Sequence, residues 1–381
     1  MAQPTKAEES LMASLPDGEV AELLRAQGLP HRRVEAWKWS DLRAAAREER
    51  AASLAYQAHL PARSSSEVYA EVHLANGECQ SSFDFLSQRP AEAEVLVQSA
   101  IASMATAAPI YQILWDEVAP KTMRVRRFSD GHGYHADRVK IVVEEGVTAT
   151  LIESHEAVGA PFANSLTEIH LKPGAHLTRI VIQPLAPEAL LIHTTLPVVE
   201  GGATYRQTTM GFGAHFARHE MHMVLRGTAE VQVDTLYRLD GKAHTDFTSH
   251  IHHQSPDCKV DQLCKGVVDG EGKAVFQGKF LVDQIAQRTD AKMAHHALLV
   301  SDRASVNAKP ELEIYADEVE CAHGNTAGAL DGEALFYLQQ RGLSANEARR
   351  LLIEAFGAEV LDRVEDEALR AELTTLFRGA E

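Results

Sequence analysis

The sequence predicts a mainly β protein with a helical region at each end, and three observations support this prediction. From about residue 65 to 325, apolar and polar side chains alternate with a period of two, which is typical of strands with one buried face. Within this stretch, strands follow glycines at regular intervals, and apolar residues at helical spacing dominate before residue 60 and after residue 330. We therefore divide the chain into regions 1–60, 61–326 and 327–381.

Residues 1–60 form the predicted N-terminal helical region. "DGEVAELLRAQGLP" has an Asp start, apolar residues at helical spacing and a Gly-Leu-Pro stop, and "EAWKWSDLRAAAREERAASLAYQAHL" resumes the helical pattern. The first 20 residues are polar and acidic, without the apolar core of a secretion signal, so we expect a cytoplasmic protein.

Region 61–326 is the predicted β core. In "GTAEVQVDTLYRL", Val231, Val233 and Tyr237 face one way while Glu230 and Gln232 face the other. Strands begin at Gly146, Gly174, Gly202 and Gly227, so the intervals are 28, 28 and 25 residues. A loose period of this kind fits a stacked β-solenoid in which each coil buries its inner face on its neighbours. The periodicity fits a large antiparallel sandwich equally well.

Region 327–381 is predicted to be helical. Asp331 can cap "GEALFYLQQRG", which ends at Gly342, and Ser344 with Glu347 forms a capping box for the next helix. A last helix, "DEALRAELTTLFRG", carries its apolar residues on one side. These helices either pack on the β core or dock a partner.

Composition and charge exclude several classes of function. The 381 residues carry a net charge of −17, which argues against nucleic acid or an anionic membrane as the main partner. No stretch approaches the roughly 20 apolar residues that a membrane span requires. The four cysteines, Cys79, Cys258, Cys264 and Cys321, are too few and too scattered for a disulfide framework, so we expect reduced thiols.

Histidine clusters suggest one enzymatic alternative. "GAHFARHEMHMVLRG" places His215, His219 and Glu220 in a pattern that resembles half of a cupin metal motif, although Ala217 replaces one expected histidine. His250 and His252 share a strand face and could hold two corners of a metal site. No nucleotide-binding loop and no G-x-S-x-G nucleophile motif is present, so an ATP-driven cycle would need an ATPase partner.

Cys321 and His323 in "YADEVECAHG" form the most distinctive pair. The segment is predicted to be a final strand that runs into a turn, on which both side chains project from one face, roughly 6.5–7 Å apart. A thiolate and an imidazole suit iron or zinc, but two ligands are half of a tetrahedral site. Either another segment or another chain supplies the rest, or a buried cysteine sits beside a histidine that caps the turn.

Longer segments resemble a known family. "KGVVDGEGKAVFQGK", "AQRTDA", "LLVSDRA", "PELEIYADEVECAHG" and "LDGEALFYLQQRG", together with "GLPHRRVEAWKWSDL" near the N-terminus, resemble the SufB/SufD family of iron–sulfur cluster assembly proteins, and the SufD branch most of all. The resemblance is close over about 110 residues. Over 60–245 it is limited to the general pattern of alternating apolar and polar residues.

The resemblance implies a right-handed parallel β-helix flanked by N- and C-terminal helices. It further implies a non-enzymatic scaffold that pairs with SufB and the SufC ATPase, with SufC at the C-terminal helices, or pairs as a homodimer when isolated. A transient Fe–S cluster would be shared with SufB at their interface, with His323 and Cys321 as ligands and none tightly bound to the isolated chain. Asn325, Cys264 and His295 depart from the family pattern, and Asn325 could alter the turn that aims His323.

Overall fold

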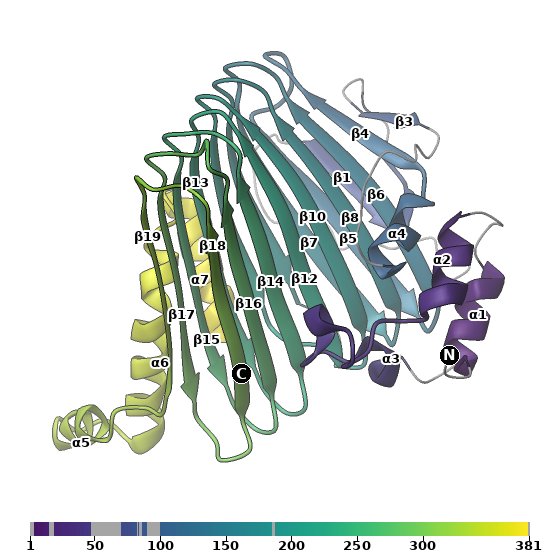
Figure 1. Cartoon of the computed structure of the whole chain (residues 1–381). Coiled ribbons are helices and arrows are strands. Elements are labelled where there is room, and N and C mark those ends of the chain that lie inside the picture. Colours follow the sequence, from purple (N-terminus) through teal and green to yellow (C-terminus); the bar gives the residue numbers. More distant parts are fainter. Residues whose placement is uncertain are drawn as a thin grey trace.

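The computed structural model describes residues 4–14, 19–46, 70–81, 83, 86–89, 100–184 and 187–379. They form a parallel β-helix with helices at both ends, so the expected fold class is confirmed (Figure 1). Strands of successive coils pair in parallel, which decides between the two folds that the periodicity left open, in favour of the solenoid. The predicted helix over 47–60 lies outside the described residues.

Each coil contributes one strand to each of two sheets. The ten-stranded sheet has the order β19-β17-β15-β13-β11-β9-β7-β5-β1-β2, with bounds β1 (Ala70–Ala75), β2 (Glu78–Cys79), β5 (Thr122–Gly131), β7 (Thr148–Gly159), β9 (His176–Gln183), β11 (Thr204–Gly211), β13 (Glu230–Leu239), β15 (Lys259–Val268), β17 (Asp290–Leu299) and β19 (Glu320–Gly328). The nine-stranded sheet has the order β18-β16-β14-β12-β10-β8-β6-β4-β3, with bounds β3 (Leu86–Arg89), β4 (Ile110–Trp115), β6 (Tyr134–Val143), β8 (Phe162–Leu171), β10 (Leu190–Glu200), β12 (Phe216–Arg226), β14 (His244–His253), β16 (Lys273–Val282) and β18 (Ser305–Ile314).

The glycine period of the sequence marks one corner of the coils. Gly146, Gly174, Gly202 and Gly227 all have positive φ angles, and the first three stack on one another. At Gly227, φ is +113°, and a Cβ atom would lie 2.5 Å from the Cα of Gly201 in the coil below. Only glycine allows both this backbone conformation and this approach, so the period in the sequence reflects the spacing of the coils.

The two sheets bury a continuous apolar interior, because alternate residues of every strand point inward. A polar band crosses this interior near β5, β7 and β9. The Arg127 guanidinium donates to Asp137, at 2.8 Å, and to Glu153, and Arg179 donates to the other oxygen of Glu153. Arg179 and Glu153 are fully buried. The opposite charges compensate one another, and without such pairing their burial would be very costly.

The N-terminal helices cover the outer face of the nine-stranded sheet. They are α1 (Lys6–Ser14), α2 (Glu19–Gln27), a 3₁₀ helix (Glu35–Trp37), α3 (Leu42–Ala45) and α4 (Ala100–Thr106). Their apolar residues pack on outward-facing side chains of β6, β8, β10 and β12. The Trp37 ring lies 4.1 Å from the guanidinium carbon of buried Arg218, which pairs with Asp246. The segment after α2 is thereby fixed to the β-helix.

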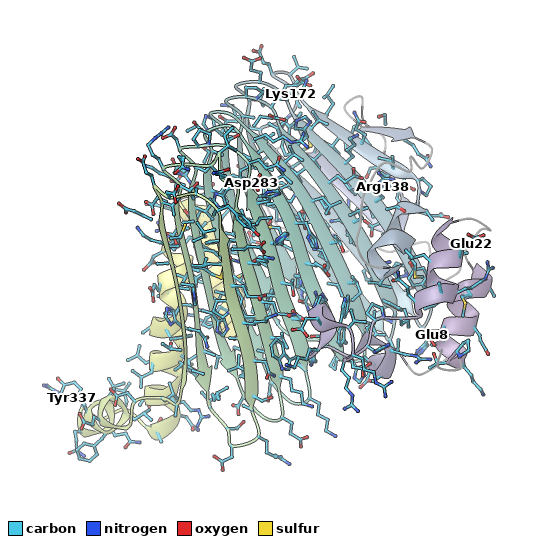
Figure 2. The ribbon with its side chains drawn as sticks, viewed as in Figure 1. Glu8, Glu22, Arg138, Lys172, Asp283 and Tyr337 are labelled. Carbon is cyan, nitrogen blue, oxygen red and sulfur yellow. The ribbon has the colours of Figure 1, made fainter. Side chains whose placement is uncertain are left out.

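The C-terminal helices are α5 (Gly332–Gln340), α6 (Ala345–Leu361) and α7 (Glu367–Gly379), with the predicted Asp331 cap and Ser344–Glu347 capping box in place. The apolar faces of α6 and α7 pack on the outer face of the ten-stranded sheet. Packing therefore accounts for these two helices. In contrast, α5 stands away from the β-helix, with Tyr337 on it (Figure 2). Phe336 and Tyr337 are both exposed. None of the helices in the described ranges is long and apolar enough to cross a bilayer.

Candidate functional site at the open end of the β-helix

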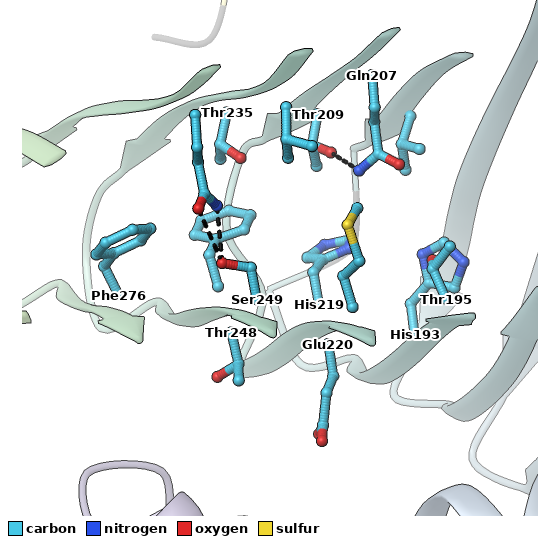
Figure 3. Close-up of a pocket in the computed structure, with 15 residues that line it drawn as sticks. His193, Thr195, Gln207, Thr209, His219, Glu220, Thr235, Thr248, Ser249 and Phe276 are labelled. Carbon is cyan, nitrogen blue, oxygen red and sulfur yellow. Dashed lines mark hydrogen bonds between the residues drawn. The ribbon is translucent and has the colours of Figure 1, made fainter. Parts of the chain in front are cut away.

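The interior holds a small cavity of about 30 Å³, lined by both polar and apolar side chains, which is room for one or two waters. His193, His219 and Gln207 point into it from opposing sheets (Figure 3). The His219 Nε2 atom lies 2.8 Å from Gln183 Oε1, and burial lowers the pKa of His219 to about 3. The imidazole is therefore neutral and already engaged within the fold.

The geometry overturns the cupin-like alternative of His215, His219 and Glu220. His219 and Glu220 are neighbours on β12, so they point to opposite faces: His219 lies inside and Glu220 outside (Figure 3). Glu220 pairs with Arg218 at 2.9 Å and with His222 at 2.7 Å, while His215 precedes the strand and is exposed. These groups cannot meet at one metal ion.

The remaining sequence clusters do not converge on a metal either. His250 and His252 do share the outer face of β14, as predicted, but His252 pairs with Asp283 at 2.9 Å. Cys258 and Cys264 are buried, free thiols. Among the residues that the structure describes, no group of three or more His, Cys, Asp or Glu side chains is arranged to hold a metal ion.

Cys321 and His323 lie on β19, the last strand of the ten-stranded sheet (Figure 1). Cys321 is paired with Ala291 and His323 with Met293 of β17, and both of these β17 side chains are in the buried interior. Because paired residues in a parallel sheet share a face, Cys321 and His323 occupy interior-facing positions. No further coil covers them in the described chain, so Cys321 is half-buried and His323 exposed.

The predicted turn after Cys321–His323 is wrong. β19 continues to Gly328, and Gly324, Asn325 and Thr326 all pair with β17. The sequence "GNTAG" has the composition of a turn, but the backbone partners offered by β17 outweigh that local preference. The alternative in which His323 caps a turn is therefore wrong as well, and Asn325 acts as a strand residue instead of shaping a turn.

The surroundings of the pair are apolar and unfinished. Val306, Ala308 and Leu312 of β18 are only partly buried against the core, although they belong to its inner face. Burial raises the pKa of the Cys321 thiol above its ordinary value, with Asp290 adding to the effect, and a backbone N–H bond opposes it. The free thiol is therefore protonated at neutral pH, and binding a metal would release its proton.

Two of the residues that the resemblance sets apart from the family pattern touch each other next to this site. His295 of β17 is paired with Asn325 of β19, and its Nδ1 atom lies 2.7 Å from Asn325 Oδ1. Cys264 of β15, the third departure, is paired with His295. The alternation pattern of the sequence assigns no function to Cys264, His295 or Asn325. Only the register of the coils shows that the three residues lie next to one another on successive strands.

Fold and geometry define a class of protein: a β-solenoid with a thiol and an imidazole side by side on a strand that no further coil covers in the described ranges. The family model "SUF system FeS cluster assembly, SufBD core domain" matches residues 127–356. The chain belongs to the SufB/SufD family of iron–sulfur cluster assembly proteins, and it is SufD-like.

Three relatives illustrate the similarity. An iron–sulfur cluster assembly SufBD family protein of Synechocystis is 30% identical over 96% of this chain and 90% of its own length. The iron–sulfur cluster assembly protein SufD of Escherichia coli is 32% identical over 60% of this chain and 55% of its own. Protein ABCI7 of Arabidopsis chloroplasts is 30% identical over 64% of this chain and 52% of its own.

Proposed function

We propose that this chain is the SufD-like, non-enzymatic scaffold subunit of a cytoplasmic complex with SufB and the SufC ATPase. A nascent Fe–S cluster is built at the interface with SufB, and His323 and Cys321 contribute two of its ligands. The observation that carries this proposal is that a thiol and an imidazole occupy interior-facing positions on a strand that no further coil covers among the described residues. Soft thiolate and imidazole donors suit iron, and the missing ligands come from the second chain.

The uncovered end supports a protein partner at this place. β18 and β19 are edge strands, and in the described chain neither is paired on its outer side. Unpaired strand edges associate readily with another chain. The partly buried apolar side chains of β18 add an apolar surface beside the two donors. SufB completes this end in the complex, and a second copy of this chain occupies it when the protein is isolated.

The C-terminal region 327–381 is the proposed docking site for SufC. Phe336 and Tyr337 on α5 are 63% and 57% exposed, and Tyr337 lies on the helix that stands away from the β-helix (Figure 2). Exposed aromatic residues of this kind often anchor protein interfaces. Because α6 is packed on β13 and β15, a movement of this region by SufC would act on the sheet that ends in β19.

The test is His323→Ala in the complex reconstituted with SufB and SufC. We expect loss of cluster formation with the complex still assembled, measured as iron and sulfide bound per complex. The matched control is His296→Ala, which removes an imidazole from the outer face of β17, one strand away. Unchanged cluster yield in His323→Ala contradicts the ligand role. If Cys321→Ala also leaves the yield intact, the chain is a structural adaptor.

A further inference from the structure

A hydrogen-bonded row leads from the interior of the β-helix to its open end. Tyr237 on β13 is buried, and its hydroxyl lies 2.9 Å from Nε2 of His295. Nδ1 of His295 lies 2.7 Å from Oδ1 of Asn325, on the uncovered strand. The His295 ring is also stacked on Phe276, with centroids 4.9 Å apart and planes 10° apart. The imidazole is therefore held at both ring nitrogens and by a stacked aromatic ring.

The chemistry of these groups fixes which group donates and which accepts in each hydrogen bond of the row. A carbonyl oxygen can only accept, so Nδ1 of His295 carries the proton and donates to Asn325 Oδ1. A neutral imidazole then has an acceptor at Nε2, and the Tyr237 hydroxyl donates to it. Burial lowers the pKa of His295 to about 4 and raises that of Tyr237 well above 10, so both groups keep these protonation states at neutral pH.

The position of Asn325 Oδ1 against His295 also fixes which end of the amide is left for the site. The oxygen is held by His295, so the NH₂ group is left to donate elsewhere, and no hydrogen bond occupies it within the described chain. Asn325 lies two residues after His323 on the same face of β19, and both side chains are exposed. Alternate residues on one strand face lie roughly 6.5–7 Å apart, which is within reach of one cluster.

We propose that the Asn325 amide N–H groups donate hydrogen bonds to a sulfur atom of the cluster that His323 and Cys321 ligate. This inference rests on the function proposed above and adds a residue to it. Asn325 is a positioning and tuning residue, because it forms no bond to iron. Hydrogen bonds to cluster sulfurs stabilise the more negative, reduced state and so raise the reduction potential.

The same pair of strands contains a matched arrangement without this role. On the outer face, Nδ1 of His296 lies 2.7 Å from the Thr326 hydroxyl. His296 and Thr326 are paired in register just as His295 and Asn325 are, one residue further along each strand. Thr326→Ala therefore removes a histidine contact of equal length from the same coil, but on the side that faces away from the donors.

The first test reads the direction of the row without any cluster. In the isolated protein, labelled with ¹⁵N-histidine, we expect the nitrogen shifts of His295 to show a protonated Nδ1 and an unprotonated Nε2. The opposite tautomer overturns the proposal, because the amide nitrogen would then have to donate to His295 and the oxygen would face the site. This result does not depend on the proposed function.

The second test uses the reconstituted complex, with Asn325→Ala and Asn325→Asp. Asp keeps an oxygen acceptor for His295 but replaces the N–H donors with a second oxygen. We expect both variants to bind a cluster with a lowered midpoint potential and faster loss to a chelator, with Asp affected at least as strongly as Ala. Thr326→Ala should match the wild type.

The outcomes separate the two proposals. If His323→Ala abolishes the cluster while both Asn325 variants match the wild type, the amide has no role and the proposed function stands. If Asn325→Ala is impaired but Asn325→Asp is not, Asn325 serves only to hold His295, and the donor role is wrong. If His323→Ala leaves the cluster unchanged, both proposals fail together.

Discussion

The two ends of the β-helix are built differently. At the N-terminal end, β1 and β4 are each followed outward by a short antiparallel strand, β2 and β3, and five of the six residues of β1 are buried. At the C-terminal end, β18 and β19 have no outer neighbour in the described ranges, and eight of the nine residues of β19 are exposed. High exposure of the terminal strand is thus a property of the C-terminal end of this β-helix and is not shared by its N-terminal end.

This difference also separates buried, paired polar groups from polar groups at an exposed end. In the half nearer the N-terminus, charged side chains such as Arg179 and Glu153 are buried and pair with each other. At the open end, Cys321 and His323 occupy equivalent interior-facing positions, but His323 lies in solvent. Four predictions test this contrast, in order of decreasing effect.

Replacing Arg179 tests the buried network. Arg179→Met keeps much of the side-chain volume but leaves Glu153 with Arg127 as its only cationic partner in the described network. We expect the free energy of unfolding to fall by about 3–5 kcal/mol in chemical denaturation, because a buried charge loses a partner. Arg288→Met, which breaks an exposed pair with Asp257, should leave the denaturation midpoint unchanged. A loss of less than about 1 kcal/mol for Arg179→Met, as at a surface pair, would contradict the account.

His253 tests the interior through pH. It is fully buried, with no partner for either ring nitrogen in the described chain, and burial lowers its pKa to about 4. Between pH 6.5 and 4 the unfolded chain binds a proton here that the folded chain does not, so stability falls as the pH falls. At pH 5 this loss is about 2 kcal/mol, and His253→Leu should remove it.

The control for that measurement lies on the same strand. His252 points to the outer face and pairs with Asp283, and it contributes less than burial to the lowered pKa of His253, so His252→Leu should reduce the acid sensitivity much less than His253→Leu does. If the wild type and His253→Leu show the same pH dependence of unfolding, His253 does not take up a proton when the chain unfolds, and the account of its burial is wrong.

The capping box of α6 should have a smaller effect. Ser344→Ala removes the side-chain acceptor for the Glu347 N–H and should cost about 1 kcal/mol. The loss should be visible as faster amide exchange in the first turn of α6, with the β-helix amides unchanged. Ser344→Asp restores an acceptor and should recover most of the protection, and equal exchange in the two variants would exclude a capping role.

His323 should have the smallest effect on stability. Its exposed side chain makes no hydrogen bond or ion pair within the described ranges, so His323→Ala should change the free energy of unfolding by no more than about 0.5 kcal/mol. Thermal unfolding of the isolated protein checks this. A loss comparable to that of Arg179→Met would mean that His323 has a structural role and that the two ends do not differ in kind.

The sequence predicts much of the fold because local chemistry determines it. Asp331, Ser344 with Glu347, and Gly342 mark helix ends by satisfying or redirecting backbone groups, and the structure confirms each. The stacked glycines reveal the coil length for the same reason. The sequence could not reveal the buried ion pairs, because Arg179 reads as a solvent-facing residue in an alternating strand until its partner on another coil is known.

The candidate site was predictable in part. The shared face of Cys321 and His323 follows from the strand period alone, whereas their exposure depends on how many coils precede and follow β19. The contact between His295 and Asn325 joins residues 30 positions apart and is set by strand register. No local pattern contains that register, which is why Asn325 was first assigned to a turn.

The most direct test of the central claim is nitrogen hyperfine spectroscopy on the reduced cluster of the complex, with only this chain ¹⁵N-labelled at histidine. The account predicts a coupling from a directly bound ¹⁵N nucleus that disappears in His323→Gln and persists in His296→Gln. A cluster with no ¹⁵N ligand coupling, or with a coupling unchanged in His323→Gln, would contradict it.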